Sequence, residues 1–134
     1  MSTKEIESVV MRYAQQIHDQ NETEFKKLWT GTDADILISG TKIFYGVESI
    51  YNDFLAGLIH DHYESILLIN DGMRISLLTA DTAVVLFSYH TECIRRNTKE
   101  PYRMAGIETQ VLVKKEDGWK IAHIQYHGKS MDAQ

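Results

Sequence analysis

The sequence has a single cysteine, a single proline and no long apolar run, and each shortage excludes a class of protein. Cys93 alone cannot form an internal disulfide framework or a zinc site built from several cysteines. No stretch approaches the ~20 apolar residues that a membrane-spanning helix requires. The N-terminal stretch is charged and no apolar run follows it. We therefore expect no signal peptide, no membrane association and a cytoplasmic location.

Basic residues are outnumbered by acidic ones, 14 Lys and Arg against 19 Asp and Glu, which gives a net charge of −5 at pH 7. Nucleic-acid binding is therefore not expected, because it needs a basic face that displaces counterions. The chain of 134 residues contains 43% hydrophobic residues, enough for one buried core. No linker, repeat or low-complexity tract interrupts it, so residues 1–134 are predicted to form a single domain.

Apolar residues recur at helical spacing in the N-terminal half of the chain. Within the first twenty residues and within 47–58 they follow the i, i+3, i+4, i+7 pattern of an amphipathic helix. Between these stretches, Asn21 followed by Glu24 is a start signal for a shorter helix that carries Phe25, Leu28 and Trp29. The sequence thus predicts three helices.

The second half of the chain is rich in β-branched and aromatic residues, which favour strands. Two short strands are expected around Gly40, and Asn70-Asp71-Gly72 is interpreted as a turn within the next segment. The longer strands are predicted over residues 63–70, 73–78, 82–93, 102–114 and 119–127. Three helices followed by about four long antiparallel strands indicate an α+β fold, with the helices on one face of the sheet.

The last two strands carry many polar side chains on one face each. By period-two alternation, Glu108 and Gln110 share one face, and His123, Gln125 and His127 share another. A hairpin loop with an even number of residues would make the two faces coincide, with Glu108 opposite Gln125. A three-residue loop with a bulge would separate them. We favour coincidence, which predicts either a ligand pocket or a wet subunit interface.

Several of these stretches resemble proteins of known fold. Val9–Tyr13, the helix at 21–29 and the closing Gly118–His123 resemble the SnoaL-like and ketosteroid isomerase group. Residues 107–111, with the following Trp–His strand, resemble the association domain of calcium/calmodulin-dependent kinase II. All belong to the nuclear transport factor 2-like superfamily. The resemblance extends from about residue 3 to 127 and implies a cystatin-like α+β fold, a cone-shaped curved antiparallel sheet wrapped by three N-terminal helices.

The resemblance to ketosteroid isomerase also implies roles for single residues. Tyr13 matches the tyrosine that donates to the substrate oxyanion, and Glu108 matches the protonated acid beside it. The aspartate general base matches Ser39, which cannot remove a proton from carbon at neutral pH. Asp35 lies on the same strand but roughly 13 Å away at ~3.3 Å per residue. The isomerase base is therefore missing.

A pocket for a small, mostly apolar molecule is the first functional hypothesis, with isomerase-, dehydratase- or cyclase-type acid–base chemistry. Glu108, Tyr13 and His127 are the catalytic candidates. Glu108 is predicted to be buried and to accept a side-chain hydrogen bond from Tyr13, Gln125 or a histidine. His123 and His127 lie about 13 Å apart along one strand, too far to bind one metal ion. No metal or cofactor is expected. The predicted ligand-binding residues are Tyr13, Trp29, Ser39, Phe54, Tyr89, Glu108, Gln110, His123, Gln125 and His127.

The alternative hypothesis is a non-catalytic association domain that resembles the kinase hub. In that interpretation the pocket is vestigial. Each candidate residue also has a purely structural interpretation, with Tyr13 and Trp29 as core residues and the histidines as hydrogen-bonded structural side chains. A homodimer through the sheet is also predicted, because the second face of the terminal hairpin is too apolar to be exposed on a monomer. A plain dimer favours the pocket, and a ring of many subunits favours the association domain. That face is predicted to carry Ile107, Val111, Ala122, Ile124 and Tyr126.

Overall fold

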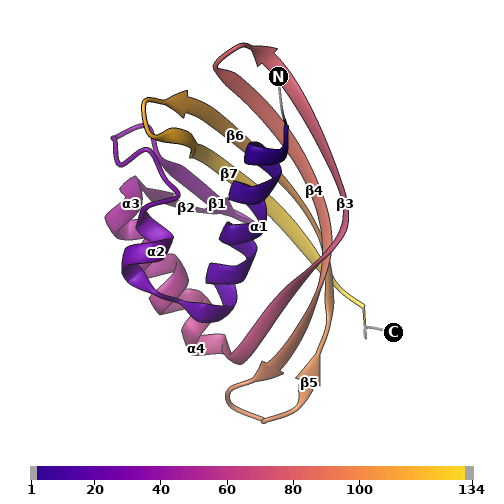
Figure 1. The fold of residues 1–134 in the computed structure, drawn as a ribbon. Coiled ribbons are helices and arrows are strands. Elements are labelled where there is room, and N and C mark those ends of the chain that lie inside the picture. Colours follow the sequence, from indigo (N-terminus) through magenta and orange to yellow (C-terminus); the bar gives the residue numbers. More distant parts are fainter. Residues whose placement is uncertain (1–2, 132–134) are drawn as a thin grey trace.

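The computed structural model describes residues 3–131, and in it a helical layer packs against the concave face of a strongly curved sheet (Figure 1). The helices are α1 (Lys4–Asp19), α2 (Glu22–Lys26) and a continuous run of α3 (Gly46–Ser49), the π-helix η1 (Ile50–Ile59) and α4 (His60–His62). The strands are β1 (Ile36–Ser39), β2 (Lys42–Tyr45), β3 (Tyr63–Thr79), β4 (Thr82–Arg95), β5 (Pro101–Tyr102), β6 (Met104–Lys115) and β7 (Gly118–Ser130). The predicted α+β cone with three helical stretches is confirmed.

The helices cover the concave face because their apolar sides point toward it. Every apolar position of the predicted first helix is buried on α1, from Ile6 to Ile17. The predicted cap of α2 is also present, since the side chain of Asn21 accepts a hydrogen bond of 3.0 Å from the Glu24 N–H. None of the helices within residues 3–131 is long and apolar enough to cross a membrane.

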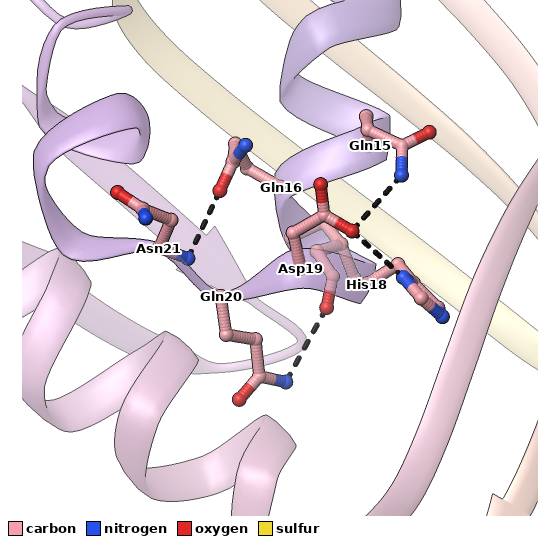
Figure 2. A network of polar contacts seen from close by, with 7 residues as sticks. Gln15, Gln16, His18, Asp19, Gln20 and Asn21 are labelled. Atoms are coloured by element: carbon pink, nitrogen blue, oxygen red, sulfur yellow. Dashed lines mark hydrogen bonds and ion pairs between the residues drawn. The ribbon is translucent and has the colours of Figure 1, made fainter.

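Helix α1 ends in a turn that directs the chain into α2, and Figure 2 shows its polar contacts. Gln20 adopts the left-handed conformation (φ 55°), and its N–H donates to the Gln16 carbonyl at 2.8 Å. The Gln16 side chain accepts from the Asn21 N–H at 3.0 Å, and Asp19 accepts from Gln15 at the same distance. The first of these bonds satisfies a carbonyl that the helix end leaves free, and the second satisfies the N–H of the residue that begins the next turn.

The described strands form one sheet in the order β2-β1-β7-β6-β4-β3, with β5 paired to β4. Only β1 and β7 pair in parallel. The predicted turn at residues 70–72 is wrong, because β3 runs through it to Thr79. The extra residue, Asp71, forms a bulge between the Asn70–Tyr89 and Gly72–Ser88 pairs, and its carboxylate contacts His90 Nδ1 at 2.8 Å.

The terminal hairpin has the expected even loop, with Lys115 paired to Gly118, yet the predicted register is wrong. Val111 pairs with His123 and Leu112 with Ile121, which leaves Ala122 unpaired in a bulge. Beyond this bulge the side-chain alternation of β7 is reversed relative to β6.

Glu108 therefore lies opposite Tyr126 rather than Gln125. Ile124 is fully buried on the concave face, whereas Gln125 is exposed. The physical reason is burial of apolar surface: the bulge turns Ile124 and Tyr126 toward the helices and leaves the polar side chains in solvent. The predicted apolar face is thus divided, with Ile107 and Val111 on the convex side.

Candidate functional site

Register across four strands arranges the concave face in rows of side chains. One row contains Phe87, Glu108, Tyr126 and Ser39, from β4, β6, β7 and β1. The row before it contains Val85, Gln110, Ile124 and Leu37. The row after it contains Tyr89, Gly106 and Gly128. Two of its three positions have no side chain, and the Tyr89 ring lies over one of them, Gly106.

Gly106 lets the Tyr89 ring lie across the backbone of β6. A Cβ atom at position 106 would come within 2.6 Å of the Tyr89 hydroxyl oxygen, closer than any real contact allows. Close approach of this kind is a common reason for glycine inside a strand. The glycine thus makes room for the Tyr89 ring.

A central cavity of about 40 Å³ lies between α1, η1 and the sheet. This space is enough for a few water-sized groups, since one water needs roughly 10–15 Å³. Most of the wall is apolar, with a few polar groups that converge from α1, β4, β6 and β7. The lining residues are Tyr13, Ile17, Phe54, Ile59, Ile66, Leu68, Tyr89, Thr91, Met104, Glu108 and Tyr126.

Glu108 is the charged residue of this cavity and is 1% exposed. Burial raises its pKa from the ordinary 4.5 to about 7, because an apolar surrounding disfavours the carboxylate. The Gln110 side chain donates a hydrogen bond of 2.6 Å to Glu108 Oε2, which opposes the rise. The predicted burial of Glu108 is confirmed, but its hydrogen-bond donor is Gln110 rather than Tyr13, Gln125 or a histidine.

Three tyrosines around Glu108 keep their protons. Burial raises the pKa values of Tyr13, Tyr89 and Tyr126, and the negative charge of Glu108 adds to each rise. The Tyr126 hydroxyl accepts a hydrogen bond of 2.7 Å from Ser39 Oγ, so its own proton can be donated elsewhere. The site therefore combines one titratable carboxyl with phenolic donors.

A second buried acid, Asp35, holds backbone segments together and has no contact with the cavity. Its carboxylate accepts hydrogen bonds from the Thr30 hydroxyl and from the Gly31 N–H, the latter at 2.8 Å. Its carbonyl accepts from the Gly46 N–H at 2.8 Å. Asp35 thus joins the loop before β1 to the start of α3, and it does not line the central cavity.

The structure brings four of the predicted site residues together in the cavity wall, namely Tyr13, Phe54, Tyr89 and Glu108. Ser39 and Gln110 stand behind that wall as hydrogen-bond partners of Tyr126 and Glu108. Trp29 lies outside the cavity wall, in an aromatic cluster with Tyr13 and Phe25. Among residues 3–131, Trp29 Nε1 and Gln110 Oε1 are buried polar atoms without a hydrogen-bond partner.

The remaining predicted residues, His123, Gln125 and His127, are not brought to Glu108. They pair with Val111, Thr109 and Ile107 on the convex face, because the bulge at Ala122 reverses the alternation. Within the described part of the chain, no three His, Cys, Asp or Glu side chains gather in a way that could hold a metal ion.

Sequence reasoning missed Tyr126, because it assigned this residue to the opposite face. The sequence carries no plain signal for the one-residue bulge that turns it inward. Thr91 was recoverable, since it follows Phe87 and Tyr89 at period two on β4. Met104 and Ile59 lie at ends of their elements, where face assignment from periodicity is least secure.

Comparison with known families and structures agrees with this architecture. The family model of a SnoaL-like domain matches residues 2–125. A nuclear transport factor 2-like superfamily protein from Salmonella enterica subsp. enterica serovar Typhimurium str. LT2 is similar in structure with a TM-score of 0.88 and 24% identity, over 98% of this chain and 93% of that chain. No curated protein sequence matches the chain.

Two further solved structures are similar at lower identity. Hexachlorocyclohexane dehydrochlorinase LinA-type3 from Novosphingobium barchaimii LL02 has a TM-score of 0.81 and 11% identity, over 96% of this chain and 89% of that chain. A candidate scytalone dehydratase from Novosphingobium aromaticivorans DSM 12444 has a TM-score of 0.83 and 15% identity, over 98% and 87%. At such identities the likeness establishes the fold alone.

Proposed function

The chain belongs to the SnoaL-like domain family, within the nuclear transport factor 2-like superfamily, and on that premise we propose that its cavity binds a small, mostly apolar molecule and moves a proton on it. The observation that carries the proposal is Glu108, a buried carboxyl with a pKa of about 7 that lines a mostly apolar cavity. A buried acid that faces an open space and titrates near neutrality is a common feature of active sites.

Glu108 is suited to general acid–base chemistry because both of its protonation states are populated near pH 7. As a carboxylate it accepts a proton from a carbon beside a carbonyl or another electron-withdrawing group. The hydroxyls of Tyr13, Tyr89 or Tyr126 donate to the oxygen on which negative charge develops. The proton then returns to another carbon, or a leaving group departs, so isomerisation, dehydration and cyclisation all fit this arrangement.

The solved relatives lend support to this class of reaction. One is a dehydrochlorinase and another is a candidate dehydratase, and each of these activities removes a proton from carbon together with a leaving group. Rapid isomerisation of a ketosteroid is not expected here, since Ser39 occupies the position matched to the base and bonds to Tyr126. General-base catalysis typically contributes a factor of ~10²–10⁴.

Binding can be tested with phenol and cyclohexanone as probes, followed by NMR of isotopically labelled protein. We expect amide shifts at Gly106 and Glu108, and a changed phenol affinity in Glu108→Gln. Glu92→Gln is the matched control, because Glu92 is exposed on the convex face of β4. Equal phenol affinity in both variants, or shifts confined to the convex face, would contradict the proposal. Native mass spectrometry of protein from its own source would then look for a retained ligand.

A homodimer through the convex face is part of the same proposal. Ile107 is 60% exposed and Leu86 43% exposed on neighbouring strands, and partly buried Val84 and Val111 pair beside them. Apolar side chains gathered on a sheet face are usually covered by a partner. Light scattering should therefore report twice the mass of one chain at micromolar concentration.

This convex surface also favours a second candidate function, a non-catalytic association domain. Polar side chains, among them His123, Gln125 and His127, lie among the apolar ones, as at the rim of many interfaces. The mass of the particle distinguishes the two functions. A ring of many subunits would support assembly as the main role, and a plain dimer supports the ligand-binding role.

A further inference from the structure

A second hollow adjoins the central cavity and is several times larger. This adjoining groove has a volume of about 340 Å³ and lies between the end of η1, α4 and the end of β7. Its wall consists of Ser39, Gly40, Leu58, Ile59, His62, Tyr63, Met104, Tyr126, His127 and Gly128. The volume is at the lower end of the ~300–1,000 Å³ that is usual for small-molecule sites.

Three side chains line both hollows, namely Ile59, Met104 and Tyr126. Two of them are held in place. Ile59 is buried at the end of η1, and Tyr126 bonds through its hydroxyl to Ser39. Met104 is the third, and its sulfur accepts a weak hydrogen bond from the Tyr63 hydroxyl at 3.9 Å. An unbranched thioether changes rotamer easily, so Met104 is the movable part of this partition.

The two volumes restrict the kind of ligand. At about 40 Å³ the central cavity accepts a hydroxyl, a carbonyl or a similarly small group, but no ring. We propose that the adjoining groove is the second half of the substrate site, so that the substrate has one small polar head beside Glu108 and an apolar body of about one or two rings in the groove. This inference rests on the proposed function, because it takes Glu108 as the group that meets the polar head.

Gly128 offers a way to fill the groove without changing the central cavity. It pairs with Gly106 on the concave face and lines the groove. A Cβ atom there would lie 3.7 Å from Met104 Sδ and from the Ala105 carbonyl oxygen, which is ordinary contact. Longer side chains at 128 therefore extend into the groove. Lys129 is the next residue on the same strand, is exposed and faces the convex side, so Lys129→Leu is a matched control.

The probes are phenol and 4-alkylphenols of increasing chain length, with affinities measured by calorimetry. For the unaltered chain we expect an increase in affinity of about fourfold per methylene until the groove is full. Gly128→Leu should abolish this increase and also weaken the binding of phenol itself, because the phenol ring lies in the groove while its hydroxyl meets Glu108. Lys129→Leu should retain the increase. Gly128→Ala should weaken the binding of the long-chain phenols by about fourfold. This variant provides the test if Gly128→Leu does not fold.

Two results would overturn the inference. One is that the affinity for 4-alkylphenols does not depend on chain length, although phenol binds and its affinity changes in Glu108→Gln. The other is an equal loss in Gly128→Leu and Lys129→Leu. A separate result bears on the proposed function: if Glu108→Gln leaves phenol affinity unchanged while Gly128→Leu still removes the chain-length effect, the groove is supported and the role of Glu108 is wrong.

Discussion

Glu108 should make the stability of this protein fall as pH rises, and the size of the effect follows from its burial. Its pKa is about 7 in the folded chain, against an ordinary value of 4.5. At about 1.4 kcal/mol for each pH unit between these values, ionising Glu108 costs the folded state about 3 kcal/mol. Such a loss is a large fraction of the ~5–15 kcal/mol that stabilises a typical domain.

The sign follows from linkage. Because the folded pKa is raised, the folded state binds the proton more tightly than the unfolded state does. The contribution of Glu108 to the free energy of unfolding is therefore complete below pH 4.5. It decreases as pH rises through the interval up to about 7 and stays low above it. Glu108→Gln removes this dependence, since the amide resembles the protonated acid in shape and charge.

Urea denaturation at a series of pH values from 4.5 to 8.5 measures the effect. The free energy of unfolding of the unaltered chain minus that of Glu108→Gln should decrease by about 3 kcal/mol across this range. Taking the difference cancels the titration of all other groups. Glu92→Gln, an identical change at an exposed position on β4, should give a nearly constant difference. A constant difference for Glu108→Gln as well would refute the burial argument.

Three more variants test the surroundings of Glu108 and the convex face. Gln110→Leu removes the hydrogen bond that lowers the Glu108 pKa, so a carbon-detected NMR titration should report a value above that of the unaltered chain. Gly106→Ala should cost about 1–3 kcal/mol of unfolding free energy through its clash with Tyr89. In a Tyr89→Ala background the same substitution should cost much less, as a double-mutant cycle would measure. Ile107→Asp should reduce the mass seen by light scattering to that of one chain, whereas a mass unchanged by this substitution would place the interface elsewhere.

The helical layer and the burial of Glu108 were predictable from the sequence because the signal for each lies within a short stretch of the chain. The apolar spacing of α1 extends over several turns, so one exceptional residue does not change the assignment. The Asn21 cap is a local backbone bond that needs no tertiary information. Glu108 lies between apolar neighbours in the middle of a strand, where an acid signals a special environment.

Which residues of β7 face the cavity was not predictable, because that depends on a single residue that breaks the period-two alternation. Ala122 and Asp71 each add one residue to a strand, and each addition reverses the side-chain faces beyond it. A period-two pattern carries no mark of where such a reversal occurs. For this reason the histidines of β7 were assigned to the pocket and Tyr126 to the opposite face.

The bulge and the glycine row also explain how one fold can hold different sites. The bulge decides which residues of β7 face the cavity, and Gly106 and Gly128 decide how much space remains there. Neither feature alters the strand order, so chains that share 11–24% of their residues retain the fold with TM-scores of 0.81–0.88. In this chain the bulge places Tyr126 in one row with Phe87, Glu108 and Ser39. A relative with a side chain at position 106 or 128, or without the extra residue at 122, should bind a ligand of different shape even where its sheet is superimposable.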